Sequence, residues 1–133
     1  MRFVLDASVA IAWAIRDEAH PLADRAFLAV QTGSAVVPAI WWYEIRNVLM
    51  LNGRRGRIEP SDSSQFLADL EQFEIEVDFP QDSDVCIELA RKHALSFYDA
   101  AYLALALRER APLATLNKQL AAAAAAEGIP DLA

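Results

Sequence analysis

The chain opens with a short apolar run that ends at a carboxylate. Phe3, Val4 and Leu5 come directly before Asp6, and two small residues follow it. An apolar run of this length is typical of a buried β-strand. In open α/β sheets, ligands bind outside the carboxyl ends of such strands. Asp6 therefore lies where a binding site would begin, and the question is whether other carboxylates reach the same place.

The rest of the chain alternates between helical and strand-like patterns. Such alternation indicates a mainly parallel sheet covered by helices on both faces. We therefore expect a three-layer α/β/α sandwich in one domain spanning residues 1–133. The alternating apolar and acidic residues at 75–79 indicate a strand at the sheet edge. The predicted strands are 3–5, 35–37, 75–79, 112–116 and a short final edge strand at 129–132; the predicted helices are 7 to about 16–18, 22–31, 39–51, 60–73, 85–93, 96–110 and 117–126.

Composition narrows the class of protein. We find no signal peptide, no run long enough to cross a bilayer, and one cysteine, Cys86, which we expect in the core. These features predict a cytoplasmic protein. The net charge of −7 argues against a general nucleic-acid binder, because phosphates are normally bound by basic surfaces. The arginines nevertheless cluster, either as a solvated basic turn or, on charge alone, as a contact for a nucleic-acid backbone: Arg46, Arg54, Arg55 and Arg57.

Two further carboxylates stand on apolar faces of predicted helices. Glu44 has apolar neighbours one turn before and after it, and Glu is rarely buried unless it is paired or bound to a metal. Asp99 shares its helical face with Tyr102 and other core-facing residues. Simpler roles remain open, because Asp6 and Asn117 suit helix N-caps and Asp99 fits a capping box.

Three carboxylates near one end of a parallel sheet would repel one another unless a cation neutralised them. Oxygen-rich sites of this kind suit Mg²⁺ or Mn²⁺, which activate water for attack on a phosphodiester. Other chemistries lack their motifs in the sequence. His20 and His93 have no partners at zinc spacing, and neither a Gly-x-Ser-x-Gly elbow nor a glycine-rich phosphate loop occurs. Metal-dependent phosphoryl chemistry is the prediction that remains.

Four blocks of the sequence resemble the signature of PIN domain ribonucleases. They are residues 4–9, 43–49, 98–103 and 112–117. In order, spacing and length they are similar to the VapC toxins of bacterial toxin–antitoxin pairs, and the resemblance covers essentially the whole chain. It implies an endoribonuclease in which Asp6, Glu44 and Asp99 bind Mg²⁺ or Mn²⁺. It also implies an RNA substrate, a homodimer, and a cognate VapB-type antitoxin inserted near the site.

The resemblance further implies that Ser8, Asn47 and Thr115 give polar support to the ligands. Position 117 is commonly Asp in this family and is Asn117 here, so the site loses one negative charge and the number of metal ions stays open. Two alternatives to a metal-dependent ribonuclease remain open. One is a PIN fold that binds a partner without cleaving RNA. The other is a receiver-like phosphoacceptor domain, although Asp6 stands alone where such a domain has an acidic pair.

Overall fold

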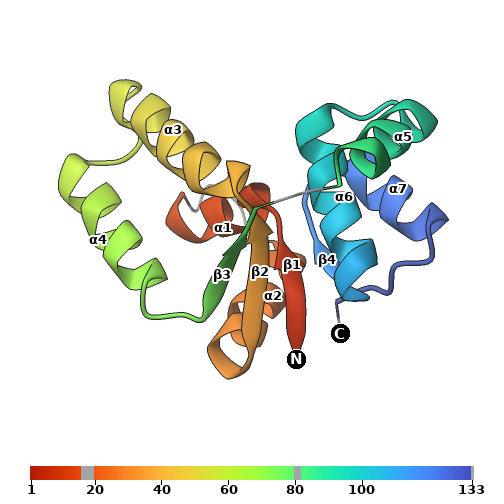
Figure 1. Cartoon of the computed structure of the whole chain (residues 1–133). Coiled ribbons are helices and arrows are strands. Elements are labelled where there is room, and N and C mark those ends of the chain that lie inside the picture. The colour runs from red at the N-terminus through yellow and green to blue at the C-terminus, as the bar shows by residue number, and fades with distance from the viewer. Residues whose placement is uncertain (16–19, 80–81, 133) are drawn as a thin grey trace.

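The computed structural model describes residues 1–15, 20–79 and 82–132. Within these residues the chain forms a four-stranded sheet in the order β3–β2–β1–β4, and each strand is parallel to its neighbours. Figure 1 shows the strands side by side, with β3 at one edge as predicted and β1 inside the sheet. The strands are β1 (Arg2–Leu5), β2 (Ser34–Pro38), β3 (Ile75–Asp78) and β4 (Leu113–Ala114).

Helices cover both faces of this sheet. Phe3, Val4 and Leu5 are all fully buried, and successive side chains of a strand point to opposite faces, so neither face of β1 meets solvent. α6 packs against β1, β2 and β4, while α2 packs against β2 and β4. The predicted three-layer α/β fold is confirmed. The helices of the described ranges are α1 (Ala7–Ala14), α2 (Pro21–Thr32), α3 (Ile40–Arg54), α4 (Pro60–Leu70), α5 (Ser83–His93), α6 (Phe97–Glu109) and α7 (Lys118–Ala126).

Local chemistry explains most helix boundaries. Pro21 and Pro60 stand in the first turns of α2 and α4, where a missing backbone N–H costs nothing. α4 ends at Leu70, three residues before its predicted end at 73. α1 is helical to Ala14, and its predicted end at 16–18 lies outside the described residues.

α3 continues beyond its predicted end at residue 51. Asn52 does not stop the helix, because its side chain is buried and donates from Nδ2 to the Val48 carbonyl oxygen at 2.8 Å. The helix ends at Arg54, just before Gly56 adopts a φ of +71°, a conformation that glycine reaches without strain. α3 therefore ends three residues later than the sequence pattern predicted.

The predicted strand at 129–132 is wrong. None of the described residues after Ala126 lies in a strand. Gly128, with a φ of +80°, turns the chain, and the Ile129 N–H donates back to the Ala124 carbonyl oxygen. Pro130 has no N–H for a sheet ladder, and Leu132 is instead buried in the core. β4 is consequently an edge strand, and at two residues it is shorter than the predicted span of 112–116.

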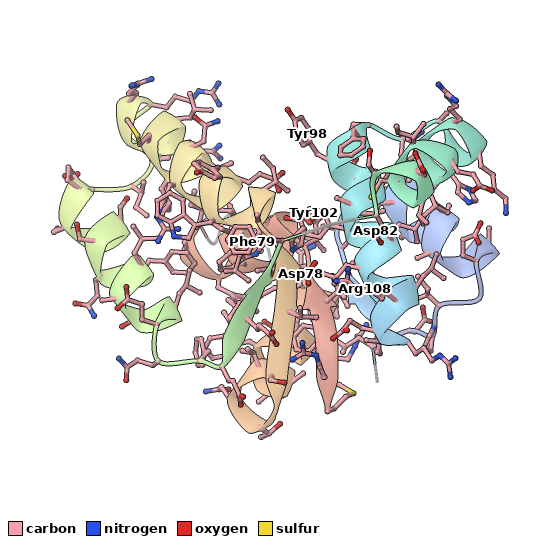
Figure 2. The ribbon with its side chains drawn as sticks, in the orientation of Figure 1. Asp78, Phe79, Asp82, Tyr98, Tyr102 and Arg108 are labelled. Carbon is pink, nitrogen blue, oxygen red and sulfur yellow. The ribbon has the colours of Figure 1, made fainter. Side chains whose placement is uncertain are left out.

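Ion pairs join strands of the sheet to one another and to α6. At the amino end of β1, Arg2 contacts Glu76 and Glu109 at 2.6 and 2.7 Å, and these hydrogen bonds raise the pKa of the arginine. Arg108 contacts Asp78 at the end of β3 at 2.6 Å, and Figure 2 shows its side chain directed toward that strand end.

In the described part of the chain, no helix is long and apolar enough to cross a membrane.

Candidate metal centre

Asp6 lies at the carboxyl end of β1, as expected, and is only 6% exposed. Two hydroxyl groups donate to its Oδ2 atom, Ser8 Oγ at 2.6 Å and Thr115 Oγ1 at 2.7 Å. No described residue donates a side-chain hydrogen bond to Oδ1. Asp6 occupies the N-cap position of α1, but its side chain makes no capping hydrogen bond. The simple capping role is therefore wrong, and the carboxylate instead accepts hydrogen bonds from Ser8 and Thr115.

The two hydroxyl groups are themselves fixed by the backbone that follows β4. The Leu116 N–H donates to Ser8 Oγ, and the Asn117 N–H donates to Thr115 Oγ1, both at 3.0 Å. Parallel pairing of β1 with β4 brings this segment beside Asp6, with Leu5 opposite Ala114 in the register. Ser8 and Thr115 thus hold the Asp6 carboxylate through hydrogen bonds to one of its oxygen atoms.

Glu44 projects from α3 as a half-buried residue and accepts a hydrogen bond from a phenol. Tyr102 Oη, on α6, donates to Glu44 Oε1 at 2.7 Å, and the tyrosine is fully buried. Burial and the charges of Asp6 and Glu44 raise the pKa of Tyr102 far above its usual value, so the phenol stays protonated. Sequence reasoning did not assign Tyr102 to the site; its only signal was a position one turn after Asp99.

Asp99 lies in the first turn of α6. Its backbone N–H donates to Ser96 Oγ at 3.1 Å, so the predicted Ser96 cap is formed. Burial raises the pKa of the Asp99 carboxyl, the charge of Asp6 raises it further, and a hydrogen bond with Ser96 opposes the rise. The residue just before it, Tyr98, is 58% exposed and projects from the start of α6 in Figure 2.

The pKa of Glu44 depends on the charges of the other two carboxylates. Burial is the largest cause that raises the pKa of Glu44, the hydrogen bond from Tyr102 opposes it, and the charges of Asp6 and Asp99 add to the rise. Within the described residues, no Arg, Lys or His forms an ion pair with any of the three. The strand end and the two helices therefore bring three acidic groups into one neighbourhood, and none of them has a cationic partner in the part of the chain that the structure describes.

This donor set fits a hard divalent cation in its chemistry. It consists of carboxylate oxygens, which Mg²⁺ and Mn²⁺ prefer, and their mutual repulsion is the effect that a cation would relieve. The described residues nevertheless contain no group of three or more His, Cys, Asp or Glu side chains already gathered as a metal site. The side chains would therefore have to draw closer together around an ion.

Two predicted supporting residues, Asn47 and Asn117, make no side-chain hydrogen bond to the three carboxylates. Asn47 is exposed on α3, one turn after Glu44, and its side chain makes no hydrogen bond to a described residue. Asn117 is also exposed, and its Oδ1 accepts the Leu120 N–H at 3.1 Å. The capping alternative for Asn117 is confirmed.

The arginines are not beside the carboxylates. Arg46 follows Glu44 by two residues, a rotation of about 200° around a helix, and so lies on the opposite face of α3. Its guanidinium stacks 3.8 Å from the Trp42 ring centroid, and burial lowers its pKa. Arg54 lies about 15 Å further along the helix than Glu44. Arg55 and Arg57 are exposed near the end of α3.

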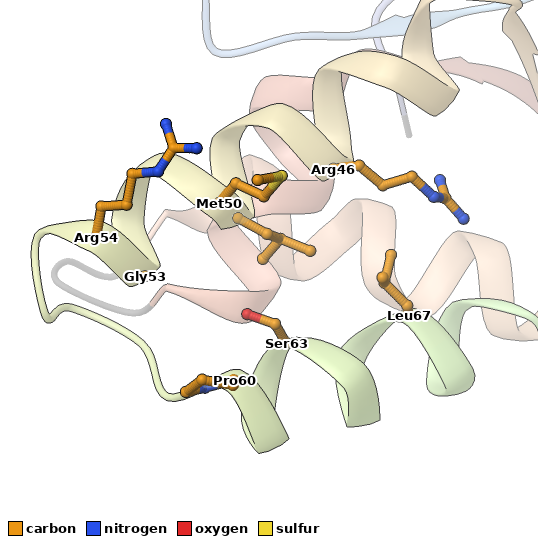
Figure 3. Close-up of a pocket in the computed structure, with 8 residues that line it drawn as sticks. Arg46, Met50, Gly53, Arg54, Pro60, Ser63 and Leu67 are labelled. Carbon is orange, nitrogen blue, oxygen red and sulfur yellow. The ribbon is translucent and has the colours of Figure 1, made fainter.

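Arg46 and Arg54 instead line a groove of about 620 Å³ between α3 and α4. Figure 3 shows Met50 between them on α3, facing Ser63 and Leu67 on α4. The groove is mostly apolar, with the two guanidinium groups near its ends. It is a separate feature from the acidic neighbourhood.

The fold agrees with comparisons to known proteins. The PIN domain family matches residues 3–126. The chain is also 34% identical over 124 residues to Ribonuclease VapC3 of Pyrobaculum aerophilum, which covers 91% of this chain and 93% of that protein. The chain therefore belongs to the PIN domain family. Within that family it is a VapC-type member, and the receiver-like alternative is wrong.

Solved structures share the fold. A crystal structure of a Pyrobaculum aerophilum protein superposes with a TM-score of 0.73 at 24% identity, covering 99% of this chain and 90% of that one. A toxin–antitoxin complex from Klebsiella pneumoniae gives a TM-score of 0.59 at 20% identity, covering 90% of each chain. At these identities the structures establish a shared architecture.

Proposed function

We propose that this chain is a divalent-metal-dependent endoribonuclease of the VapC type. The observation that carries the proposal is the convergence of Asp6, Glu44 and Asp99 from three elements without a cationic partner among the described residues. The similarity to Ribonuclease VapC3 supports RNA as the substrate. Asp6, Glu44 and Asp99 would hold Mg²⁺ or Mn²⁺.

A bound ion of this kind polarises a phosphoryl oxygen and lowers the pKa of water. The chain's own residues prepare the place. Ser8 and Thr115 donate to Asp6 Oδ2, and these two hydrogen bonds fix the orientation of the carboxylate. Because an RNA phosphodiester is itself anionic, the three carboxylates repel it until their charge is neutralised. RNA binding at this site should therefore depend on the metal.

The proposal includes a contact between the arginine cluster and the RNA backbone. Arg54, Arg55 and Arg57 lie about four turns of helix from Glu44 at most, so an RNA strand cut at the acidic site could extend to them. Arg46 is the least suited, since its guanidinium is engaged by Trp42. A salt titration of RNA affinity for the charge-removing variants tests this contact.

The proposal includes a protein partner and a homodimer. Exposed large apolar side chains gather on α3, namely Trp42, Tyr43, Met50 and Leu51. Surfaces of this kind are typical of protein interfaces. A VapB-type antitoxin is the partner that a VapC-type toxin would have. Co-expression with a candidate antitoxin, followed by light scattering of the free and complexed chain, measures both assemblies.

A cleavage assay tests the activity directly. Labelled single-stranded RNA is incubated with Mn²⁺ or Mg²⁺ and wild type, Asp6→Ala or Asp99→Ala, with EDTA as the metal-free arm. We expect cleavage by wild type only, and only with metal. Undiminished cleavage by both variants, or full activity in EDTA, contradicts the proposal. Metal binding without cleavage by wild type favours the non-cleaving PIN fold instead.

The RNA target needs a separate experiment. Transcriptome-wide mapping of RNA ends, after expression of wild type beside Asp6→Ala, locates the sites that depend on the carboxylate. Ends that recur in wild type alone identify the sequence or shape that is read. Identical end profiles for the two proteins would contradict endoribonuclease activity in the cell.

A further inference from the structure

We propose that Tyr102 is a positioning residue that holds the Glu44 carboxylate in register with Asp6 and Asp99. The inference rests on the proposed metal site and goes beyond it, because it assigns a role to a residue that coordinates nothing. It concerns a buried phenol rather than a further ligand.

The phenol contacts the elements that bear all three carboxylates. Its Oη donates to Glu44 on α3 at 2.7 Å, across 58 positions of sequence. The backbone of Ala7, the residue directly after Asp6, lies close enough to the phenol to lower the pKa of Tyr102. Tyr102 itself follows Asp99 by three residues on α6, so the two side chains share a helical face. The hydroxyl group therefore lies where α1, α3 and α6 meet, and it joins α6 to α3 through its bond to Glu44.

Burial makes this link rigid. Tyr102 is fully buried and belongs to the core, so the position of its Oη is fixed by packing against its neighbours. Glu44 is long, flexible and only half-buried, and it faces the negative charges of Asp6 and Asp99. Repulsion alone would turn the Glu44 side chain away from them. The hydrogen bond from Tyr102 opposes that movement.

A phenol suits this role because it donates without carrying a charge. Lys or Arg at the same place would neutralise part of the acidic cluster and compete with a metal ion for the carboxylates. A neutral donor orients Glu44 and leaves the full negative charge for the cation. Partner groups that orient metal ligands in this way typically contribute about 10- to 100-fold to metal affinity.

Tyr102→Phe removes only the hydroxyl and tests the inference. Calorimetry with Mn²⁺ should show affinity about 10- to 100-fold weaker than wild type. Tyr98→Phe is the matched control, since this exposed tyrosine precedes Asp99 and makes no hydrogen bond to a described residue. We expect its Mn²⁺ affinity to equal that of wild type. Circular dichroism and Tm in EDTA report separately on folding.

A second variant keeps the test decisive if Tyr102→Phe folds poorly. Glu44→Asp retains the charge but withdraws the carboxylate from the phenol by one methylene group, and we expect weaker Mn²⁺ binding. Adding Tyr102→Phe to Glu44→Asp should then change the affinity by less than about twofold, because the link is already broken.

The outcomes separate the two proposals. Wild-type Mn²⁺ affinity in Tyr102→Phe, whatever its Tm, overturns the positioning role and leaves the proposed ribonuclease standing. An equal loss in the wild-type and Glu44→Asp backgrounds also overturns it, since Tyr102 would then act independently of Glu44. Failure of wild type to bind Mn²⁺ or Mg²⁺ overturns the proposed function and this inference together.

Discussion

The acids that hold the sheet to α6 and the acids of the candidate site differ in their partners. At the amino end, Glu76 and Glu109 both pair with Arg2. Asp78, at the carboxyl end of β3, likewise pairs with Arg108. In the candidate site, hydroxyl groups donate to Asp6 and Glu44, and no described cation forms an ion pair with Asp6, Glu44 or Asp99. Among the described residues, acids are thus paired where they hold the sheet to α6 and unpaired where three elements converge.

This difference indicates the role of each group of acids. Paired surface acids add little to stability but cost little, whereas unpaired acids in a half-buried cluster oppose folding through mutual repulsion. A cost of that kind at a strand end is typical of a site that an external ligand completes. The net charge of −7 does not reveal this contrast, because it is a sum over paired and unpaired acids alike.

The largest expected effect comes from removing one charge at the carboxyl end. Asp6→Asn keeps the size of the side chain and still offers an oxygen to Ser8 and Thr115. We expect Mn²⁺ affinity and RNA cleavage to fall by more than about 100-fold, because even groups that only support a ligand contribute about 10- to 100-fold. Calorimetry and the cleavage assay measure the two effects.

Asp78→Asn is the matched control for this change. Asp78 also ends a strand, but it is paired with Arg108. Its loss should leave metal affinity and cleavage as they are in wild type. Equal losses of metal affinity and cleavage in the two variants would mean that the pairing of an acid does not decide its role in function.

A smaller effect is expected from the hydroxyl that supports Asp6. Thr115→Val removes the donor to Asp6 Oδ2 and leaves the Asn117 N–H without its acceptor. Metal affinity should fall by about 10- to 100-fold. The free energy of unfolding should fall by about 1–3 kcal/mol, as expected when a buried partner is lost. Urea denaturation and calorimetry give the two values.

Thr32→Val serves as the control for Thr115→Val. The Thr32 hydroxyl donates to the Leu28 carbonyl oxygen on the exposed side of α2. Its removal should change the free energy of unfolding by less than about 0.5 kcal/mol and leave metal affinity unchanged. A similar metal affinity in both valine variants would show that Asp6 does not need the Thr115 hydroxyl.

The metal-free protein should become more stable when one acid of the cluster is neutralised. Burial and like charges raise the pKa of Glu44 in the folded state, so the folded protein holds this proton more tightly than the unfolded chain. The charged form therefore destabilises the fold above that raised pKa, and the cost disappears as pH falls through it. In EDTA at pH 7, Glu44→Gln should melt a few degrees above wild type.

This advantage should shrink as the pH is lowered, because wild-type Glu44 then becomes neutral as well. Addition of Mn²⁺ at pH 7 should reverse the order, since wild type binds the ion more tightly and is stabilised by it. Melting curves from pH 4 to pH 8, with EDTA or Mn²⁺, measure the pattern. A Tm difference independent of pH would assign the effect to packing rather than to charge.

The smallest effect is expected at the amino end. Arg2→Gln breaks the contacts with Glu76 and Glu109, which are at least partly exposed to solvent. Such pairs contribute about 1 kcal/mol or less, and salt screens them. Urea denaturation at low and high salt should therefore differ from wild type only slightly, and cleavage should be unchanged. A marked loss of cleavage would show that the two ends are coupled.

The features that follow from local chemistry could be predicted from the sequence. The run ending at Asp6 marks a strand end, and helical periodicity places Glu44 and Asp99 on inward faces. The same periodicity puts Arg46 on the other side of α3 from Glu44, a consequence that charge alone overlooked. The strand predicted at 129–132 failed because apolar residues that pack as an irregular tail look the same as a short strand.

Features that depend on packing between distant elements could not be predicted. The bond between Tyr102 and Glu44 joins α3 to α6, and no local pattern fixes how these helices meet. The hydroxyl support of Asp6 likewise depends on β4 lying beside β1. The family resemblance named Thr115, whereas Tyr102 emerged only from the arrangement of the folded chain.

The cap at Asn117 bears on how readily the acidity of this site can change during evolution. The cap requires only a side-chain oxygen that accepts the Leu120 N–H, and Asp supplies one as well as Asn does. A negative charge is moreover favourable at the start of a helix. Asn117→Asp can therefore place a fourth carboxylate two hydrogen bonds away from Asp6 without disturbing α7. At this position, the electrostatics of the site can evolve independently of the fold.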